Sequence, residues 1–222
     1  MTQLTAVIFD VGNVLFDWNL RFLYERLIDD DRALDAFLRD VMTMEWHLQH
    51  DAGRPFAETS AELIAQHPEH AALIAALGPG FNETIRGVVP GMEVLVAELH
   101  NAGVPLFAIT NFSGEFWRPF RAAHAAFFDR LRDVVVSGDE GLMKPDRAIY
   151  ELALGRFGLR AEEAVFFDDN PANVAGAAAV GIEARLFTGE VGCRAALVDL
   201  GFSLGISGRE CRKRECPPKV VS

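Results

Sequence analysis

Short apolar runs without period-two alternation recur along the chain. Runs of this kind, rich in β-branched and aromatic residues, are typical of parallel strands that helices cover on both faces. The runs are TAVIF (5–9), VPLFAI (104–109), DVVVS (133–137) and AVFF (164–167), with EARLF (183–187) as a candidate fifth. They predict a buried parallel sheet.

Helical spacing of apolar residues fills the segments between these runs. It is clearest in residues 90–103, 147–158 and 170–181, and the first of these has Pro90 near its start and Gly103 at its end. Alternating strands and helices predict a doubly wound, Rossmann-like α/β core. The ligand of such a core binds beyond the carboxyl ends of the strands.

The first two predicted strands are separated by far more chain than one crossover helix needs. Apolar residues at helical spacing fill most of this segment, with breaks at DAGRP and LGPG. We therefore expect a helical cap domain at 17–88, inserted into a core domain formed by 1–16 and 89–202. The pattern decays after Phe202, which predicts a flexible tail at 203–222.

Composition narrows the possible partners. Half of the residues are hydrophobic and the formal net charge is −11, so we expect a globular protein that repels nucleic acid and anionic membranes. Asp10 precedes any signal-like apolar segment, and an odd count of three cysteines fits free thiols in a reducing compartment. The expected location is the cytoplasm, and no pattern indicates the oligomeric state.

Polar residues follow the predicted strands where each strand ends, and in a parallel sheet these ends share one edge. They are Asp10 after the first strand, Thr110 and Asn111 after the second, Lys144 in the loop after the third, and Asp168 and Asp169 after the fourth. Three carboxylates in one small volume repel one another unless a cation is present. Mg²⁺ prefers such oxygen ligands together with phosphate oxygens.

The same residues suggest phosphate chemistry. Lys144 would provide a positive charge for a phosphate, with the Thr110 hydroxyl and the Asn111 N–H as neutral donors. The Asp10 carboxylate can attack phosphorus and form an aspartyl-phosphate. Gly12 would let the chain turn and expose a carbonyl to the metal, and Asn173 would turn inward to fix the loop after the fourth strand.

Four motifs in this order resemble those of the haloacid dehalogenase-like hydrolase superfamily: FDVGNVL, ITN, KP and FFDDNPANV. The resemblance covers residues 5 to about 188 and is greatest for a subgroup of small bacterial sugar-phosphate phosphatases that includes α-glucose-1-phosphate phosphatase. It implies Asp10 as the nucleophile and Mg²⁺ bound by Asp10, the Gly12 carbonyl and Asp169. It further implies that Asp168 lies next to the metal ligands and orients them without binding the metal itself. Thr110, Asn111 and Lys144 would hold the phosphoryl group.

One position departs from the superfamily pattern. Most of its phosphatases have a second Asp two residues after the nucleophile, which protonates the leaving group, whereas this chain has Gly12. Asp17 is a candidate substitute, although an acid at this point of the chain is more typical of a helix cap, and protonation by water or by the substrate is the alternative. Trp46, Asp51 and Arg54 are candidates for the substrate-facing side of the cap.

Three functions remain open on the sequence alone. The first is a Mg²⁺-dependent phosphatase that hydrolyses a small phosphorylated metabolite, such as a sugar phosphate, through an aspartyl-phosphate. The second is a metal-independent 2-haloacid dehalogenase in which Asp10 attacks carbon. The third is a catalytically inactive member of the fold with a binding or regulatory role. His47 and His50 show no metal-ligand pattern, and we expect surface or packing roles for them.

Overall fold

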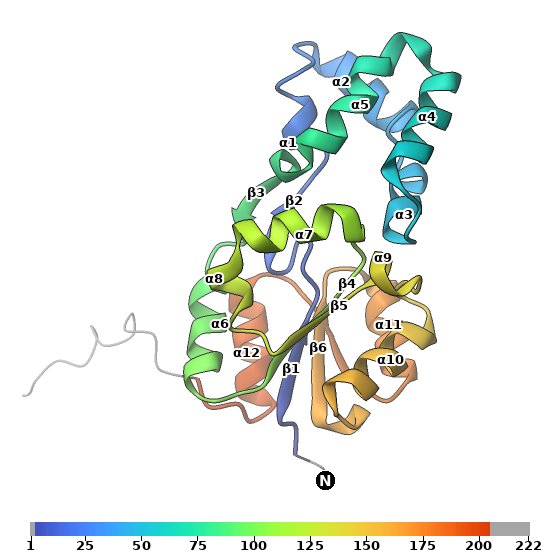
Figure 1. Ribbon diagram of the computed structural model, residues 1–222. Coiled ribbons are helices and arrows are strands. Elements are labelled where there is room, and N and C mark those ends of the chain that lie inside the picture. Colours follow the sequence, from blue (N-terminus) through green and yellow to red (C-terminus); the bar gives the residue numbers. More distant parts are fainter. Residues whose placement is uncertain (1–2, 205–222) are drawn as a thin grey trace, which may run out of the picture.

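The computed structural model describes residues 3–204, built around a five-stranded parallel sheet (Figure 1). The strands lie in the order β5-β4-β1-β6-β7. Their bounds are β1 (Ala6–Phe9), β4 (Leu106–Thr110), β5 (Asp133–Val136), β6 (Ala164–Asp168) and β7 (Glu183–Leu186). Each of the five apolar runs in the sequence thus contains a strand. The strand order reverses beside β1, which places a ligand crevice at the carboxyl end of that strand.

Alternate residues of the strands pack against helices on opposite faces of the sheet. Val7 and Phe9 belong to one apolar cluster, and Ala6 and Ile8 belong to the other. The first face is covered by α6 (Met92–Asn101) and α12 (Glu190–Asp199), and the second by α10 (Arg147–Phe157) and α11 (Pro171–Ala179) (Figure 1). Burial on both faces explains why the strand sequences do not alternate. The predicted doubly wound α/β fold is confirmed.

A helical part stands above the carboxyl edge of the sheet (Figure 1). It lies between two strands, β2 (Phe16–Trp18) and β3 (Ile85–Val88), which form an antiparallel pair. We propose this pair as the boundary between cap and core, where the sequence divides them at residues 17 and 88. The helices of the cap are α1 (Arg21–Tyr24), α2 (Asp31–Asp40), α3 (Met44–Asp51), α4 (Phe56–Gln66), η1 (Pro68–His70), α5 (Ala71–Gly80) and η2 (Phe81–Thr84).

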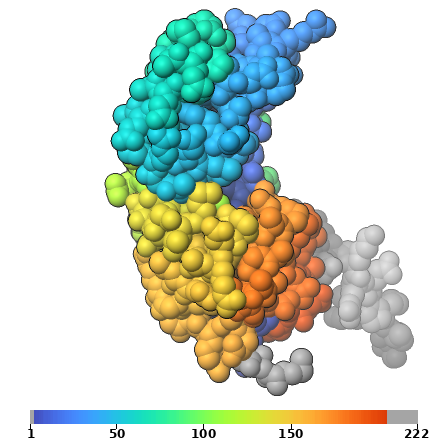
Figure 2. All heavy atoms as spheres, turned by 90° about the vertical axis from the view of Figure 1, so that its right-hand side faces the viewer, coloured from blue at the N-terminus to red at the C-terminus, as the bar shows by residue number. Residues whose placement is uncertain are grey.

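The cap rests on helices that follow β4 and β5, and its atoms meet those of the core directly (Figure 2). The Phe81 ring of η2 stacks on Phe116 of the core with ring centroids 4.3 Å apart. The Ser137 Oγ donates to the Asp51 carbonyl at 2.6 Å. These core helices are α7 (Gly114–Ala123), α8 (Ala125–Phe128) and α9 (Ser137–Glu140), and η3 (Ala161–Glu163) precedes β6.

The described residues also bear on membrane-spanning segments, on the C-terminal tail and on the cysteines. In residues 3–204, no helix combines the length and hydropathy that crossing a bilayer requires. The predicted tail at 203–222 lies almost wholly outside the described residues, as do Cys211 and Cys216. Cys193 is a buried free thiol in α12.

Candidate active site

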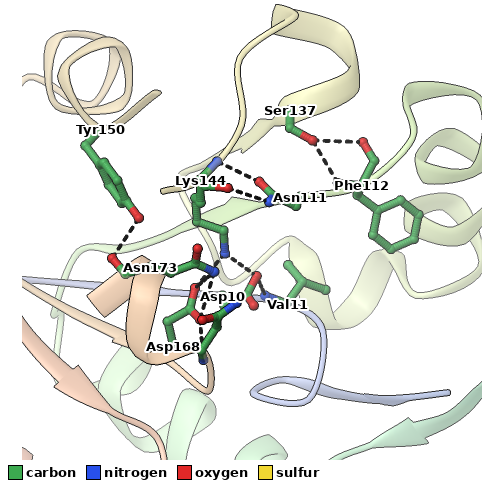
Figure 3. Close-up of polar contacts among 10 residues, drawn as sticks. Asp10, Val11, Asn111, Phe112, Ser137, Lys144, Tyr150, Asp168 and Asn173 are labelled. Carbon is green, nitrogen blue, oxygen red and sulfur yellow. Dashed lines mark hydrogen bonds and ion pairs between the residues drawn. The ribbon is translucent and has the colours of Figure 1, made fainter. Parts of the chain in front are cut away.

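Asp10 is the first residue beyond β1 and stands at the carboxyl edge of the sheet (Figure 3). Its backbone N–H donates to the Phe167 carbonyl at 2.8 Å, so the main chain still follows the sheet. Its Oδ1 accepts the Val11 N–H at 2.7 Å. The carboxylate is therefore fixed at the strand end, with 8% of the residue exposed.

Lys144 lies between two carboxylates, as Figure 3 shows. Its Nζ is 2.7 Å from Asp10 Oδ1 and 2.7 Å from Asp168 Oδ2, and the residue is 2% exposed. The Asn111 side chain fixes the Lys144 main chain, because it accepts the Lys144 N–H at 2.9 Å and donates to the Lys144 carbonyl at 3.0 Å. A lysine ammonium has three N–H donors, so one remains for another acceptor.

Asp168 is fully buried and held from several directions. Asn173 Nδ2 lies 3.1 Å from each of its carboxylate oxygens, and the Asn170 N–H donates to Oδ1 at 2.8 Å. Tyr150 in turn donates to the Asn173 carbonyl at 2.8 Å. Asn173 therefore points inward, as the sequence suggested, and Asp168 is positioned to orient Lys144.

The three acids form a compact group. Asp10, Asp168 and Asp169 each offer an oxygen, and these atoms lie within 4.8 Å of one another. Burial raises the pKa of Asp10 to about 7; the Lys144 ammonium opposes this rise and the Asp168 carboxylate adds to it. Burial also raises the pKa of Asp169, and Asp168 adds to that rise. One ammonium does not balance three carboxylates, so the donor set fits a hard divalent cation.

The turn after Asp10 differs from the expectation at one residue. The left-handed backbone conformation belongs to Asn13, with φ of 57°, and not to Gly12. Asn tolerates this conformation better than most residues, and the Asn13 side chain stabilises the turn by accepting the Trp18 N–H at 3.1 Å. A side chain at Gly12 would meet no atom within 4 Å of its Cβ. Space therefore remains where related phosphatases carry their second Asp.

A cavity of about 240 Å³ lies between the sheet edge and the cap. Its polar lining comes mostly from the core and includes Asp10, Gly12, Asn13, Asn111, Asp169 and Asn173. Its apolar lining includes Phe16, Trp18, Met44, Leu48, Phe81 and Ile85. The cap adds two polar side chains to the lining of the cavity, those of His47 and Asp51.

Some candidate residues lie elsewhere. Thr110, at the end of β4, and Lys144 are both buried and neither is part of the cavity lining, so their phosphate-binding roles stay predictions. Asp17 lies in β2, outside the lining. Trp46 donates to the Thr59 carbonyl inside the cap, and Arg54 pairs with Glu62 at 2.7 Å. Of the three cap candidates, only Asp51 reaches the cavity.

Asp51 was a candidate for the substrate-facing side of the cap, whereas His47, expected to have a surface or packing role, lies beside it in the cavity lining. The His47 ring packs 5.0 Å from the Trp18 ring, and its Nε2 is 4.0 Å from Asp51 Oδ1. Burial, with a smaller contribution from the neighbouring His50, lowers the pKa of His47 to about 3, so the ring is neutral. The signal in the sequence is the spacing of Met44, His47, Leu48 and Asp51, which places all four on one face of a helix.

The site places an aspartate at the end of a central parallel strand, beneath a helical cap. A family model described as haloacid dehalogenase-like hydrolase matches residues 4–181. The chain belongs to this family, which confirms the resemblance drawn from its four motifs. The likeness to the sugar-phosphate subgroup stays a prediction.

Similar proteins include phosphatases. A sesquiterpene phosphatase of Aspergillus oryzae is 30% identical over 184 residues, covering 82% of this chain and 88% of that enzyme. A phosphoserine phosphatase of Thermus thermophilus is 33% identical over 96 residues, covering 43% of this chain and 38% of that enzyme. A haloacid dehalogenase family enzyme of Bacteroides thetaiotaomicron, solved with magnesium and inorganic phosphate, has a TM-score of 0.65 at 17% identity, over 84% of this chain and 95% of that chain. The chain is thus a hydrolase of a family with phosphatase relatives.

Proposed function

We propose that the protein is a Mg²⁺-dependent phosphatase that hydrolyses a small phosphorylated metabolite through an aspartyl-phosphate on Asp10. The carrying observation is that Asp10 faces a cavity beside Asp169, while buried Lys144 bridges Asp10 and Asp168. The paired acids argue for a metal, because a phosphate dianion would be repelled by Asp10 and Asp169 alone.

The residues divide the work of phosphoryl transfer. Asp10 attacks phosphorus, and Lys144 orients its carboxylate and stabilises negative charge on the phosphoryl oxygens. Asn111 holds the Lys144 loop through its side chain and is part of the cavity lining. Asp168 and Asn173 keep Lys144 in place.

Magnesium would be held by Asp10, the Gly12 carbonyl and Asp169. When bound, the ion neutralises charge on the phosphate and on the acids around it. Asp10 would then be ionised at neutral pH despite its burial, since a cation beside a carboxylate lowers its pKa. The magnesium complex of the Bacteroides enzyme, which has the same fold, is in line with this assignment.

The lining of the cavity bears on the substrate. A sugar phosphate, implied by the sequence resemblance, stays a prediction that requires donors and acceptors for its hydroxyl groups. The walls instead carry Trp18, Met44, Leu48 and Phe81, and Met44 and Leu48 are partly exposed at the cavity. An apolar wall gains from burying hydrocarbon. We therefore favour a phosphate monoester with an apolar leaving group, and the name of the Aspergillus relative supports this choice.

The direct test is phosphate release from a panel of monoesters that contains farnesyl phosphate, glucose 1-phosphate, phosphoserine and phenyl phosphate. Activity should need Mg²⁺, disappear with chelator and be absent in Asp10→Asn. The ratio of kcat/KM for farnesyl phosphate over glucose 1-phosphate tests the apolar substrate; a ratio below one would favour the sugar phosphate. Chloride release from a 2-chloro acid with chelator present would instead favour the dehalogenase, and tightly bound Mg²⁺ with turnover of neither class would point to a binding or regulatory role.

A further inference from the structure

Gly12 occupies the position where most phosphatases of this family carry the acid that protonates the leaving group, so the proton donor must be another group. We propose that Asp51, at the end of cap helix α3, is the catalytic acid and base of this site. This assignment rests on the proposed phosphatase function. It makes the cap part of the catalytic machinery and not only a cover.

Asp51 is delivered by a helix face that points into the cavity. Met44, His47, Leu48 and Asp51 lie at i, i+3, i+4 and i+7 of α3, and all four line the same cavity as Asp10. Asp51 is therefore on the cap side of this cavity, and Asp10 is on the core side. A substrate whose phosphate lies at Asp10 has its leaving oxygen directed away from the core.

The main chain of Asp51 is anchored, whereas its carboxyl group is largely unengaged. Ser137 Oγ donates to the Asp51 carbonyl at 2.6 Å, which fixes the end of α3 on the core. In residues 3–204, no side chain donates a hydrogen bond to the Asp51 carboxyl: His47 Nε2 at 4.0 Å is too distant, and only the backbone N–H of Ser113 acts on this group. The residue is nonetheless only 6% exposed. A buried acid with little hydrogen bonding is unusual without a role.

The surroundings of Asp51 allow it to exchange a proton near neutral pH. Burial raises its pKa to about 7, and the Asp10 carboxylate adds to the rise. Lys144 and the Ser113 N–H oppose it. An acid of this strength can both give and take a proton at the pH of a cell.

The reaction balances with these groups. A lone pair of Asp10 Oδ forms a bond to phosphorus while the bond from phosphorus to the leaving oxygen breaks, and its electron pair stays on that oxygen. The Asp51 carboxyl gives its proton to this oxygen, which leaves as an alcohol. The Asp51 carboxylate then takes a proton from water as the water oxygen bonds to phosphorus. The bond from phosphorus to Asp10 breaks, its electrons return to Asp10, and phosphate leaves with Asp51 protonated again.

A purely structural role for the Asp51 side chain is the competing explanation. In that case Asp51→Asn would loosen the cap and affect every substrate alike. An acid has a different signature, because its loss matters most for leaving groups that are poor without a proton. p-Nitrophenolate needs no proton to leave, whereas an alkoxide does.

The experiment compares p-nitrophenyl phosphate with an alkyl phosphate in the presence of Mg²⁺. For Asp51→Asn we expect kcat/KM to fall about 10²–10⁴-fold for the alkyl ester and much less for p-nitrophenyl phosphate. Because the second step loses its base, p-nitrophenolate should appear in a burst equal to the enzyme concentration, followed by slow turnover. Mass spectrometry should detect the phosphorylated enzyme.

A second variant moves the acid to the core. Gly12→Asp has open space for its side chain, so the double variant Gly12→Asp with Asp51→Asn should regain alkyl phosphate turnover. Asp40→Asn is the matched control, because Asp40 is an exposed cap acid on α2 that pairs with Arg39 and lies outside the cavity lining, so both substrates should be unaffected. Melting temperatures of all variants verify that they are folded.

The outcomes separate the two proposals. Equal losses on both substrates without a burst, or full activity of Asp51→Asn, would overturn the role of Asp51. A double variant that stays inactive although Gly12→Asp alone turns over would overturn it as well. If the wild-type protein releases no phosphate from any ester, the proposed phosphatase function itself fails, whereas an active wild type that needs Asp10 but not Asp51 leaves that function standing.

Discussion

Lys144 is a single positive side chain that satisfies two buried carboxylates, with its Nζ at 2.7 Å from Asp10 and from Asp168. Removing one partner from a buried ionic group leaves the others uncompensated, which costs about 3–5 kcal/mol. We expect Lys144→Met to lower the free energy of unfolding by this amount in the absence of Mg²⁺ and to abolish phosphatase activity. Urea unfolding measures the first effect and phosphate release the second.

Arg147→Met is the comparison for Lys144, because Arg147 forms an exposed ion pair with Glu151 one turn along α10. Exposed pairs contribute little to stability, so this variant should unfold near the wild-type urea concentration. Equal destabilisation by the two substitutions would show that the buried Lys144 ion pairs contribute no more to the free energy of unfolding than an exposed pair does.

His50 is a second buried residue whose charge state is fixed by the fold. Burial lowers its pKa from 6.5 to about 4, against the raising effect of Glu115. The folded protein therefore binds fewer protons than the unfolded chain below pH 6.5, so this group contributes stability above pH 6.5 and loses it as the pH falls towards 4. Each pH unit in that window costs about 1.4 kcal/mol.

His50→Gln should remove this acid sensitivity, since Gln can still bond to Thr59 Oγ1, which lies 2.6 Å from His50 Nε2. The measurement is the free energy of unfolding of both proteins from pH 7.5 to 4.5. Asp10 and Asp51 titrate in the same range but are present in both, so their effect cancels in the difference. Parallel profiles would mean that the pKa of His50 is the same in the folded and unfolded states.

At the scale of elements, α11 approaches the Lys144 loop at a glycine. A Cβ on Gly176 would lie 2.5 Å from the Pro145 carbonyl oxygen, so Gly176→Ala forces α11 away from the loop. Because α11 also carries Asn173, we expect a loss of about 1–3 kcal/mol and a lower kcat. Gly155→Ala in α10 has open space and should instead stabilise by about 0.5–1 kcal/mol. Urea unfolding and steady-state kinetics of the pair measure both effects, and similar results would show that α11 adjusts freely.

The sequence predicted a strand well where burial on both faces produces an apolar run. It predicted a strand poorly where the strand forms only by pairing with a distant segment of the chain. Strands β1, β4 and β6 are buried on both faces, so their apolar runs mark them directly. Strand β2 has three residues and exists only because it pairs with β3 far along the chain. Helix α7 contains Pro119 and starts on Gly114, and both residue types disfavour a helix, so it was not predicted although its apolar residues lie on one face.

The same distinction holds for the site at the scale of the whole molecule. The approach of Asp10, Lys144 and Asp168 follows from parallel strands sharing one edge, so motif order was enough to predict it. Asp51 depends on how the cap docks on the core, which no local pattern encodes. Trp46 illustrates the difference, since it is two positions from Met44 on α3 and so faces the interior of the cap.

The site brings together the carboxyl ends of β1 and β6, the loop that carries Lys144, and the cap. A cation bound there should therefore stabilise the whole fold. Binding to the folded state alone adds RT ln(1 + [L]/Kd), which is about 2.7 kcal/mol when Mg²⁺ exceeds its Kd 100-fold. We expect Mg²⁺ to raise the melting temperature over a chelated sample, and Asp169→Asn to lose this shift. Asp129→Asn, an exposed acid on α8's C-terminal side that pairs with Arg121, should keep it. Phosphate release that persists in chelator, with identical melting curves in both media, would refute the magnesium requirement.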